Sequence, residues 1–182
     1  MMMKKNRISP FYFDLNKSER NDLTKNFSKI LKSSKLILGN ETIKFESQFA
    51  KYIGTKYAIA VNSGTTALQI LLMLNIKKAK TLVAVPTNTN FATVAAILYS
   101  GGTPFYLDMD EKYFAPKYQD IIRLYKKFKF KGIVWVHIGG IMSPDFIKVK
   151  NFCNKRKIFL IEDCAHAHGS SVKGIKAGSK SN

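Results

Sequence analysis

Two patterns of apolar and polar positions alternate along the chain after residue 55, one typical of strands and one typical of helices. Short runs rich in β-branched and aromatic residues are typical of buried strands, and between them apolar positions recur at helical spacing. The predicted strands are residues 57–61, 81–85, 103–107, 132–136 and 158–161. The predicted helices between them are residues 65–75, 90–100, 117–127 and 144–155. Strands with little polar alternation, each followed by a helix, predict a three-layer α/β fold with a mostly parallel sheet flanked by helices.

The N-terminal part has a different pattern, without strands. Helical spacing predicts one helix over residues 18–33 and another over 42–52, closed by Gly54. We expect residues 1–38 to form an N-terminal arm and helix, and residues 39–182 to belong to one larger domain. In that domain, Ser143 as cap and Pro144 at the first helical position mark the start of the last helix.

Composition places the chain among ordinary globular proteins. It has 182 residues, of which 46% are hydrophobic, enough to bury one sizeable core. The first ten residues, MMMKKNRISP, lack the regions of a signal peptide, and the longest apolar run, 67–76, is too short to cross a bilayer. The two cysteines, Cys153 and Cys164, do not make a disulfide framework. We therefore expect a soluble, cytoplasmic protein without membrane partners.

The charge is strongly positive, with 30 Lys and Arg against 12 Asp and Glu, a net +18. Such an excess can serve nucleic acids, an anionic membrane surface or anionic small molecules. The best local candidate is residues 125–131, YKKFKFK, where aromatic rings could stack on bases between lysines. The same run is typical of a lysine-rich helix end followed by a strand. No nucleic-acid motif accompanies it, so nucleic-acid binding by a non-catalytic α/β module is the alternative hypothesis rather than the preferred one.

Polar residues follow the predicted strands, at the edge where open α/β sheets bind ligands. The turn 62–67, NSGTTA, opens a helix, and the free amides there favour a phosphate lined by Ser63, Gly64, Thr65 and Thr66. Ordinary helix capping by Ser63 or Thr65 explains the same residues equally well. The sequence leaves both interpretations open.

Asp163 is the most informative residue of the stretch 158–169, IFLIEDCAHAHG. A carboxylate at the end of a buried strand is costly unless a cation or hydrogen-bond donors meet it. A protonated pyridine nitrogen would serve, because the carboxylate keeps such a ring charged. A turn in which Asp163 accepts backbone amides is the alternative.

A metal site is a further alternative for the same stretch. Cys164, His166 and His168 alternate along it, but no second ligand pair at zinc-like spacing occurs elsewhere. We therefore expect no metal.

Five segments in register resemble one family. They are SGTTA at 63–67, VPTNTNFAT at 85–93, GGTPFYLD at 101–108, VHIGG at 136–140, and IEDCAHAHGS at 161–170 followed by Gly174 and Gly178. From about Gly39 to the C-terminus the chain resembles the DegT/DnrJ/StrS-type aminotransferases. The resemblance implies a fold type I enzyme with pyridoxal phosphate (PLP), homodimeric at full length. It also implies amination of nucleotide-linked keto sugars with an amino-acid donor, in polysaccharide biosynthesis.

The resemblance also implies roles for the matching positions. Gly64 and Thr65 would hold the PLP phosphate, Asp163 would pair with the pyridine nitrogen, and Glu162 would be structural. His166 stands where the family usually has glutamine near the ring hydroxyl. The residues expected to bind the cofactor are Ser63, Gly64, Thr65, Thr66, Phe91, Asp163 and His166.

Two departures from the family pattern concern the aromatic residue and the lysine. Asn90 aligns with the aromatic residue that stacks on the PLP ring, and Phe91 lies one position later, which on a helix swings a side chain by about 100°. The catalytic lysine of the family follows a segment that resembles 174–178, so we expect it beyond Asn182. Lys173, Lys176 and Lys180 are expected to be solvated surface residues. The resemblance thus implies an inactive N-terminal fragment that lacks the rest of the large domain and the small domain.

Overall fold

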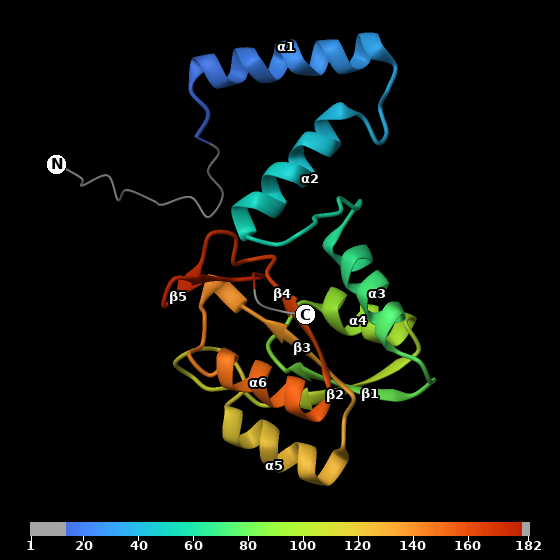
Figure 1. Ribbon diagram of the computed structural model, residues 1–182, viewed down its shortest axis with the longest axis vertical. Coiled ribbons are helices and arrows are strands. Elements are labelled where there is room, and N and C mark those ends of the chain that lie inside the picture. The colour runs from blue at the N-terminus through green and yellow to red at the C-terminus, as the bar shows by residue number, and fades with distance from the viewer. Residues whose placement is uncertain (1–13, 180–182) are drawn as a thin grey trace, which may run out of the picture. The chain divides into compact units, whose positions relative to one another are not determined.

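The computed structural model describes residues 14–179, which divide into two compact units, one ending at Phe45 and one beginning at Glu46 (Figure 1). In the first unit, α1 (Lys17–Ser33) begins with a reciprocal cap. The Asn16 side chain accepts the Glu19 amide at 3.0 Å, and the Glu19 carboxylate accepts the Asn16 amide at 2.8 Å. Such pairs satisfy two amides that a helix start leaves free. The predicted helix 18–33 is therefore confirmed.

α2 (Asn40–Ile53) begins in the first unit and ends in the second, where Ala50 and Ile53 are buried. It extends the predicted helix 42–52 by two residues at its start and one at its end. Gly54 follows with φ of 89°, a conformation that closes helices and that glycine adopts without strain.

The second unit is built on a four-stranded sheet in the order β2-β1-β3-β4. Its strands are β1 (Thr81–Pro86), β2 (Gly102–Leu107), β3 (Gly132–Val136) and β4 (Phe159–Asp163), and every pair is parallel. The register places Gly132 beside Phe159 and Val136 beside Asp163. Pro104 lies within β2, which is an edge strand, the place where a sheet tolerates a residue without an amide hydrogen.

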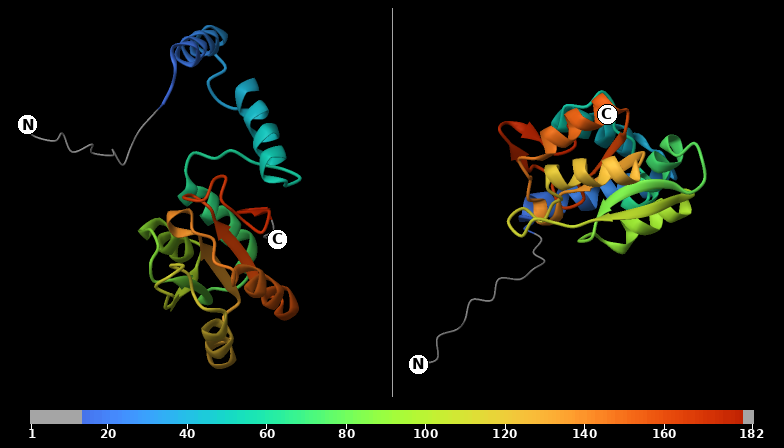
Figure 2. Two further views of the ribbon diagram at one scale, coloured as in Figure 1. Left: turned by 90° about the vertical axis from the view of Figure 1, so that its left-hand side faces the viewer. Right: turned by 90° about the horizontal axis from the view of Figure 1, so that it is seen from below.

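Helices cover both faces of this sheet, as the views in Figures 1 and 2 show. α3 (Gly64–Asn75) and α4 (Phe91–Tyr99) lie on one face, and α5 (Tyr118–Phe128) and α6 (Phe146–Arg156) lie on the other. Alternate residues of β3 enter separate cores: Ile133 and Trp135 pack with α5 and α6, and Val134 and Val136 with α3 and α4. The predicted three-layer α/β fold is confirmed.

One predicted strand is wrong. Residues 57–61 form neither helix nor strand, although they alternate as a half-buried strand would. No strand among the described residues pairs with them, and Tyr57 and Ile59 are 72% and 82% exposed. The Ala60 amide instead donates to the Glu46 carboxylate at 2.8 Å. Alternation can indicate a strand, but only a neighbouring strand can complete its hydrogen bonds.

The helix predicted from residue 144 begins later, at Phe146, with Asp145 as its N-cap residue. Ser143 closes the turn before it, because its hydroxyl accepts the Asp145 amide at 3.2 Å. The sequence patterns also missed three short elements: a 3-10 turn (Ile138–Gly140) and a hairpin of β5 (Ser171–Val172) and β6 (Ile175–Lys176). Such elements are too short for any periodicity to show.

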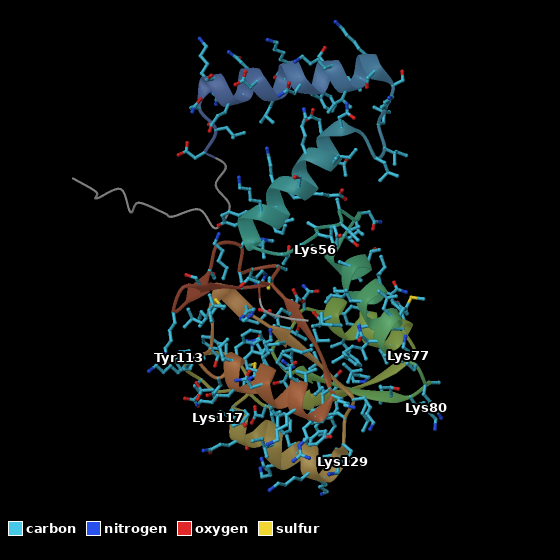
Figure 3. The ribbon with its side chains drawn as sticks, in the orientation of Figure 1. Lys56, Lys77, Lys80, Tyr113, Lys117 and Lys129 are labelled. Carbon is cyan, nitrogen blue, oxygen red and sulfur yellow. The ribbon has the colours of Figure 1, made fainter. Side chains whose placement is uncertain are left out.

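The lysine-rich run 125–131 is a helix end followed by a buried residue. α5 stops at Phe128, Lys129 has a left-handed backbone, and Phe130 is fully buried. The Tyr125 ring meets the Phe130 ring edge-on at 5.3 Å. Lysines are spread widely over this unit: Figure 3 places Lys77 and Lys80 near the start of β1, and Lys117 and Lys129 at the two ends of α5. The aromatic rings of this run are thus largely engaged in packing.

Among the described residues, none of the helices has the length and apolar character that a bilayer span requires.

Candidate functional site

A change of direction in the chain path marks the candidate site. The chain passes from β1 through α4 to β2 on one side, and from β2 through α5 to β3 on the other side of β1. The connections therefore lie on opposite faces, and the loops after β1 and β3 separate at the carboxyl ends of these strands. Open α/β sheets bind ligands at such a switch point.

A small pocket lies at this point. It is lined by Asn90, Val136, His137, Ile138, Asp163, Ala165 and His166. Its volume of about 30 Å³ holds little more than one water-sized group. The pocket can therefore take the edge of a ring, and the bulk of a larger ligand would lie outside it.

Asp163 ends β4 in this pocket and is held by two different donors. Its Oδ1 accepts the Ala165 amide at 3.2 Å, and its Oδ2 accepts the Thr93 hydroxyl at 3.1 Å. Thr93 in turn accepts a hydrogen bond from the Thr89 hydroxyl at 2.9 Å. The turn-type bond that the sequence left open is thus present, together with a side-chain bond from α4, and the residue still faces the pocket.

His166 is oriented by the 3-10 turn after β3. Its Nδ1 accepts the Gly139 amide at 3.3 Å, so a neutral ring carries its proton on Nε2 and can donate from there. Gly140 has φ of 74°, and a Cβ added to it would lie 2.8 Å from the His166 carbonyl oxygen. Only glycine fits this approach, so the VHIGG segment keeps His166 beside the pocket.

The start of α3 is capped by its own serine. The Ser63 hydroxyl accepts the Thr66 amide at 3.1 Å and lies 3.0 Å from the Thr66 hydroxyl. Ser63 and Thr66 are therefore engaged with each other, as the capping interpretation predicts. The amides of Gly64 and Thr65 are the first of the helix, and helix geometry gives them no partner within it. These two amides are the ones suited to an anion.

The residues 63–66 do not line the small pocket, so their grouping with Asp163 in one site stays a prediction. The same holds for Phe91. It is the first residue of α4 and is 77% exposed, whereas Asn90 lines the pocket and caps the helix by accepting the Ala92 amide at 2.9 Å.

Glu162 and the pocket-lining His137 form a buried pair. His137 Nε2 lies 3.1 Å from Glu162 Oε2, and both side chains are almost completely buried. The same carboxylate oxygen accepts the Gly178 amide at 3.0 Å, which ties β4 to the segment after the hairpin. This agrees with the structural role expected for Glu162.

Cys164 joins this pair and not the histidines next to it in sequence. Among the described residues, the group that could hold a metal ion is His137, Glu162 and Cys164, not the alternating set considered from the sequence. Burial, with the charges of Glu162 and Asp163, raises the pKa of the Cys164 thiol to about 12. The thiol is therefore protonated near neutral pH, which disfavours it as a ligand.

The two described lysines near the C-terminus do not line the pocket. Lys173 occupies the turn between β5 and β6 with φ of 50°. Lys176 donates to the Tyr52 carbonyl at 2.5 Å, and its Nζ lies 3.9 Å from the Tyr52 ring centre. Lys180 lies outside the described residues.

The sequence placed Thr89, Thr93 and His137 in polar segments after predicted strands but assigned none of them a role in the site. A signal for Thr93 exists, because it is the one buried hydroxyl in the largely apolar helix FATVAAILY. A buried hydroxyl needs a partner, but the partner here is 70 residues away in sequence.

Curated relatives of the chain are sugar aminotransferases. GDP-perosamine synthase of Escherichia coli O157:H7 is 38% identical over 141 residues, which are 77% of this chain and 38% of that protein. The dTDP-3-amino-3,6-dideoxy-alpha-D-galactopyranose transaminase of Aneurinibacillus thermoaerophilus is 32% identical over 91% of this chain and 45% of its own length. The chain thus spans less than half the length of these two relatives.

Solved structures that resemble this chain include aminotransferases, like the relatives found by sequence. An aminotransferase from Psychrobacter cryohalolentis superposes with a TM-score of 0.79 at 30% identity, over 94% of this chain and 42% of that one. NtdA of Bacillus subtilis, solved with the bound cofactor PMP, superposes with a TM-score of 0.79 at 30% identity, over 90% of this chain and 37% of that one. The family of these enzymes depends on PLP. Residues 17–182 match the DegT/DnrJ/EryC1/StrS aminotransferase family as a whole, and the chain belongs to that family.

Proposed function

We propose that this chain forms the cofactor-binding part of a PLP-dependent aminotransferase that acts on a nucleotide-linked keto sugar. The observation that carries the proposal is the Asp163 carboxylate, which ends β4 and faces a pocket at the switch point. Family membership and the nucleotide-sugar names of the relatives support the substrate class.

The described residues fit this cofactor in three respects. Asp163 offers an anionic acceptor to a protonated ring nitrogen. The Gly64 and Thr65 amides offer donors to a phosphate, and a Cβ on Gly64 would meet no heavy atom within 4 Å, so the space beside Gly64 is open. The pocket-lining His137 has a buried Nδ1 for which the described residues provide no hydrogen-bond partner.

Each side chain would have a distinct task. When bound, PLP supplies an electron sink for carbanion chemistry. Asp163 would hold a proton on the ring nitrogen, and His166 would donate from Nε2 to the ring oxygen. Ser63 keeps the α3 amides directed outward by capping the helix. Asn90 borders the ring position, and Phe91 remains the proposed stacking residue.

The wider setting follows from the same assignment. An amino acid would supply the amine, since aminotransfer needs a donor. A homodimer is supported by exposed apolar side chains on α3, such as Met73 and Leu74, which are 59% and 63% exposed. We further propose that the protein acts in the cytoplasm, where nucleotide sugars are substrates for amino-sugar biosynthesis.

Binding of pyridoxamine phosphate (PMP) tests the proposal, because PMP needs no covalent lysine. Titration into the chain, followed by the fluorescence of its single tryptophan, Trp135, should give saturable binding. Asp163→Asn should weaken binding by ten-fold or more, since a hydrogen bond between charged groups is worth about 1.5–3 kcal/mol. Asp108→Asn is the control, because that carboxylate follows β2 and does not line the pocket. Equal binding by D163N would contradict the proposed role.

A nucleic-acid-binding module remains the competing hypothesis. The burial of Phe130 and the packing of Tyr125 disfavour it, because base stacking needs accessible rings. Salt-sensitive RNA or DNA binding without PMP affinity would favour that alternative.

A further inference from the structure

Thr93 is a buried hydroxyl on an otherwise apolar helix. It is 1% exposed and lies among the alanine, valine and isoleucine residues of α4. A hydroxyl in such a place costs free energy unless it is hydrogen-bonded on both sides. Here it is: Thr89 donates to it at 2.9 Å, and it donates to Asp163 at 3.1 Å.

The direction of this chain of hydrogen bonds is fixed by its first member. A threonine hydroxyl has one proton and can rotate. Because Thr93 accepts the proton of Thr89, its own proton is directed to Asp163 Oδ2. The relay, meaning the hydrogen bonds from Thr89 to Thr93 and from Thr93 to Asp163, therefore ends on Oδ2, whereas the Ala165 amide donates to Oδ1.

Two donors from different elements fix the plane of this carboxylate. The rotation of an aspartate carboxylate about χ2 is otherwise broad. Ala165 follows β4, whereas Thr93 belongs to α4 on the same face of the sheet as α3. Loss of the Thr93 hydroxyl or of the Ala165 amide as a donor would leave the carboxylate freer to rotate about χ2.

We infer that Thr93 is a positioning residue that orients the Asp163 carboxylate through the relay from Thr89. Thr93 does not line the pocket, so it acts through Asp163 and not by touching a ligand. The consequence of this orientation for the ring nitrogen of the cofactor rests on the proposed function. The effect of Thr93 on the Asp163 carboxylate does not rest on it, and can be measured without a ligand.

The first measurement uses the ligand-free chain. The side-chain carboxyl ¹³C resonance of Asp163 is assigned by its absence in D163N. In Thr93→Val, which keeps the shape and removes the hydroxyl, this resonance should move, and in Thr93→Ser it should stay near the wild-type position. An unmoved resonance in folded T93V would overturn the inference. Should T93V fail to fold, Thr89→Val takes its place, because it removes only the donor that directs the Thr93 proton, and an unmoved resonance there has the same consequence.

The second measurement uses PMP labelled with ¹⁵N in its ring. T93V should weaken PMP binding by about three- to ten-fold, less than D163N, because one donor to the carboxylate remains. The ring ¹⁵N resonance should shift towards the unprotonated position in T93V and recover in T93S. Weaker binding without a ¹⁵N change would indicate a merely structural role and overturn the inference at the cofactor. If wild type binds no PMP, the proposed function fails, and the ligand-free resonance alone decides the role of Thr93.

Discussion

Gly132→Ala should strongly destabilise the protein through one contact. Gly132 begins β3 beside Phe159 of β4, and a Cβ added there would lie 2.0 Å from Phe159 Cζ and 2.1 Å from Cε2. Carbon atoms in contact lie about 3.5–4.0 Å apart, so the ring would have to move by roughly 1.5 Å. Overpacking of this kind costs about 1–3 kcal/mol, and this overlap should reach the upper end. A cost of about 3 kcal/mol raises the unfolding constant by roughly 150-fold.

Urea denaturation followed by Trp135 fluorescence measures this change, because Trp135 is fully buried in β3. Gly102→Ala is the matched control: its Cβ would lie 2.9 Å from Ile76 Cδ1, 3.0 Å from Ile97 Cγ2 and 3.2 Å from the Ile97 carbonyl oxygen. These overlaps are smaller than the one at Gly132, so a cost at the lower end of the range, about 1 kcal/mol, is expected. The double variant G132A with Phe159→Ala should be more stable than the sum of the single effects by about 1–3 kcal/mol. A stable G132A, or strict additivity, would refute the steric argument.

Three further predictions concern packing, thiol chemistry and acid stability. Phe130→Ala should cost about 3–5 kcal/mol in urea unfolding, and Phe128→Ala, at a site 38% exposed, clearly less; equal costs would contradict the buried role of Phe130. With a pKa raised to about 12, Cys164 should react with iodoacetamide near pH 8 at least about ten-fold more slowly than an ordinary thiol until urea unfolds the chain. Peptide mapping separates it from Cys153, and rapid labelling of Cys164 in the native chain would refute the raised pKa. The hydrogen bond from Lys148 lowers the pKa of Asp145; partial burial opposes this shift, and the Tyr118 amide adds to it. Because the pKa is lower in the folded chain than in the unfolded chain, the ionised Asp145 stabilises the fold above about pH 4, and this stabilisation is lost as the pH falls through the folded pKa. Asp145→Asn should therefore flatten the acid side of the stability curve, and an unchanged slope would count against the pair.

The sequence predicted the sheet well because its strands are continuous apolar runs. Residues 132–136 match β3 at both ends, and the helix after Ser63 begins one residue before its predicted start. Residues 57–61 failed because a strand depends on a neighbour that no local pattern reveals. Asp163 could be found from its place after a buried strand, whereas Thr93 could not, because its role depends on a contact across 70 residues.

The two edge strands of the described sheet differ in their backbone hydrogen-bond donors. Pro104 leaves β2 with one amide hydrogen fewer, which hinders pairing of another chain with that edge. At the other edge β4, FLIED, has an amide on every residue. In the part of the chain that the structure describes, an added strand should therefore pair more readily along β4 than along β2, so a charged residue or proline introduced on β4 should do more to limit aggregation than one on β2.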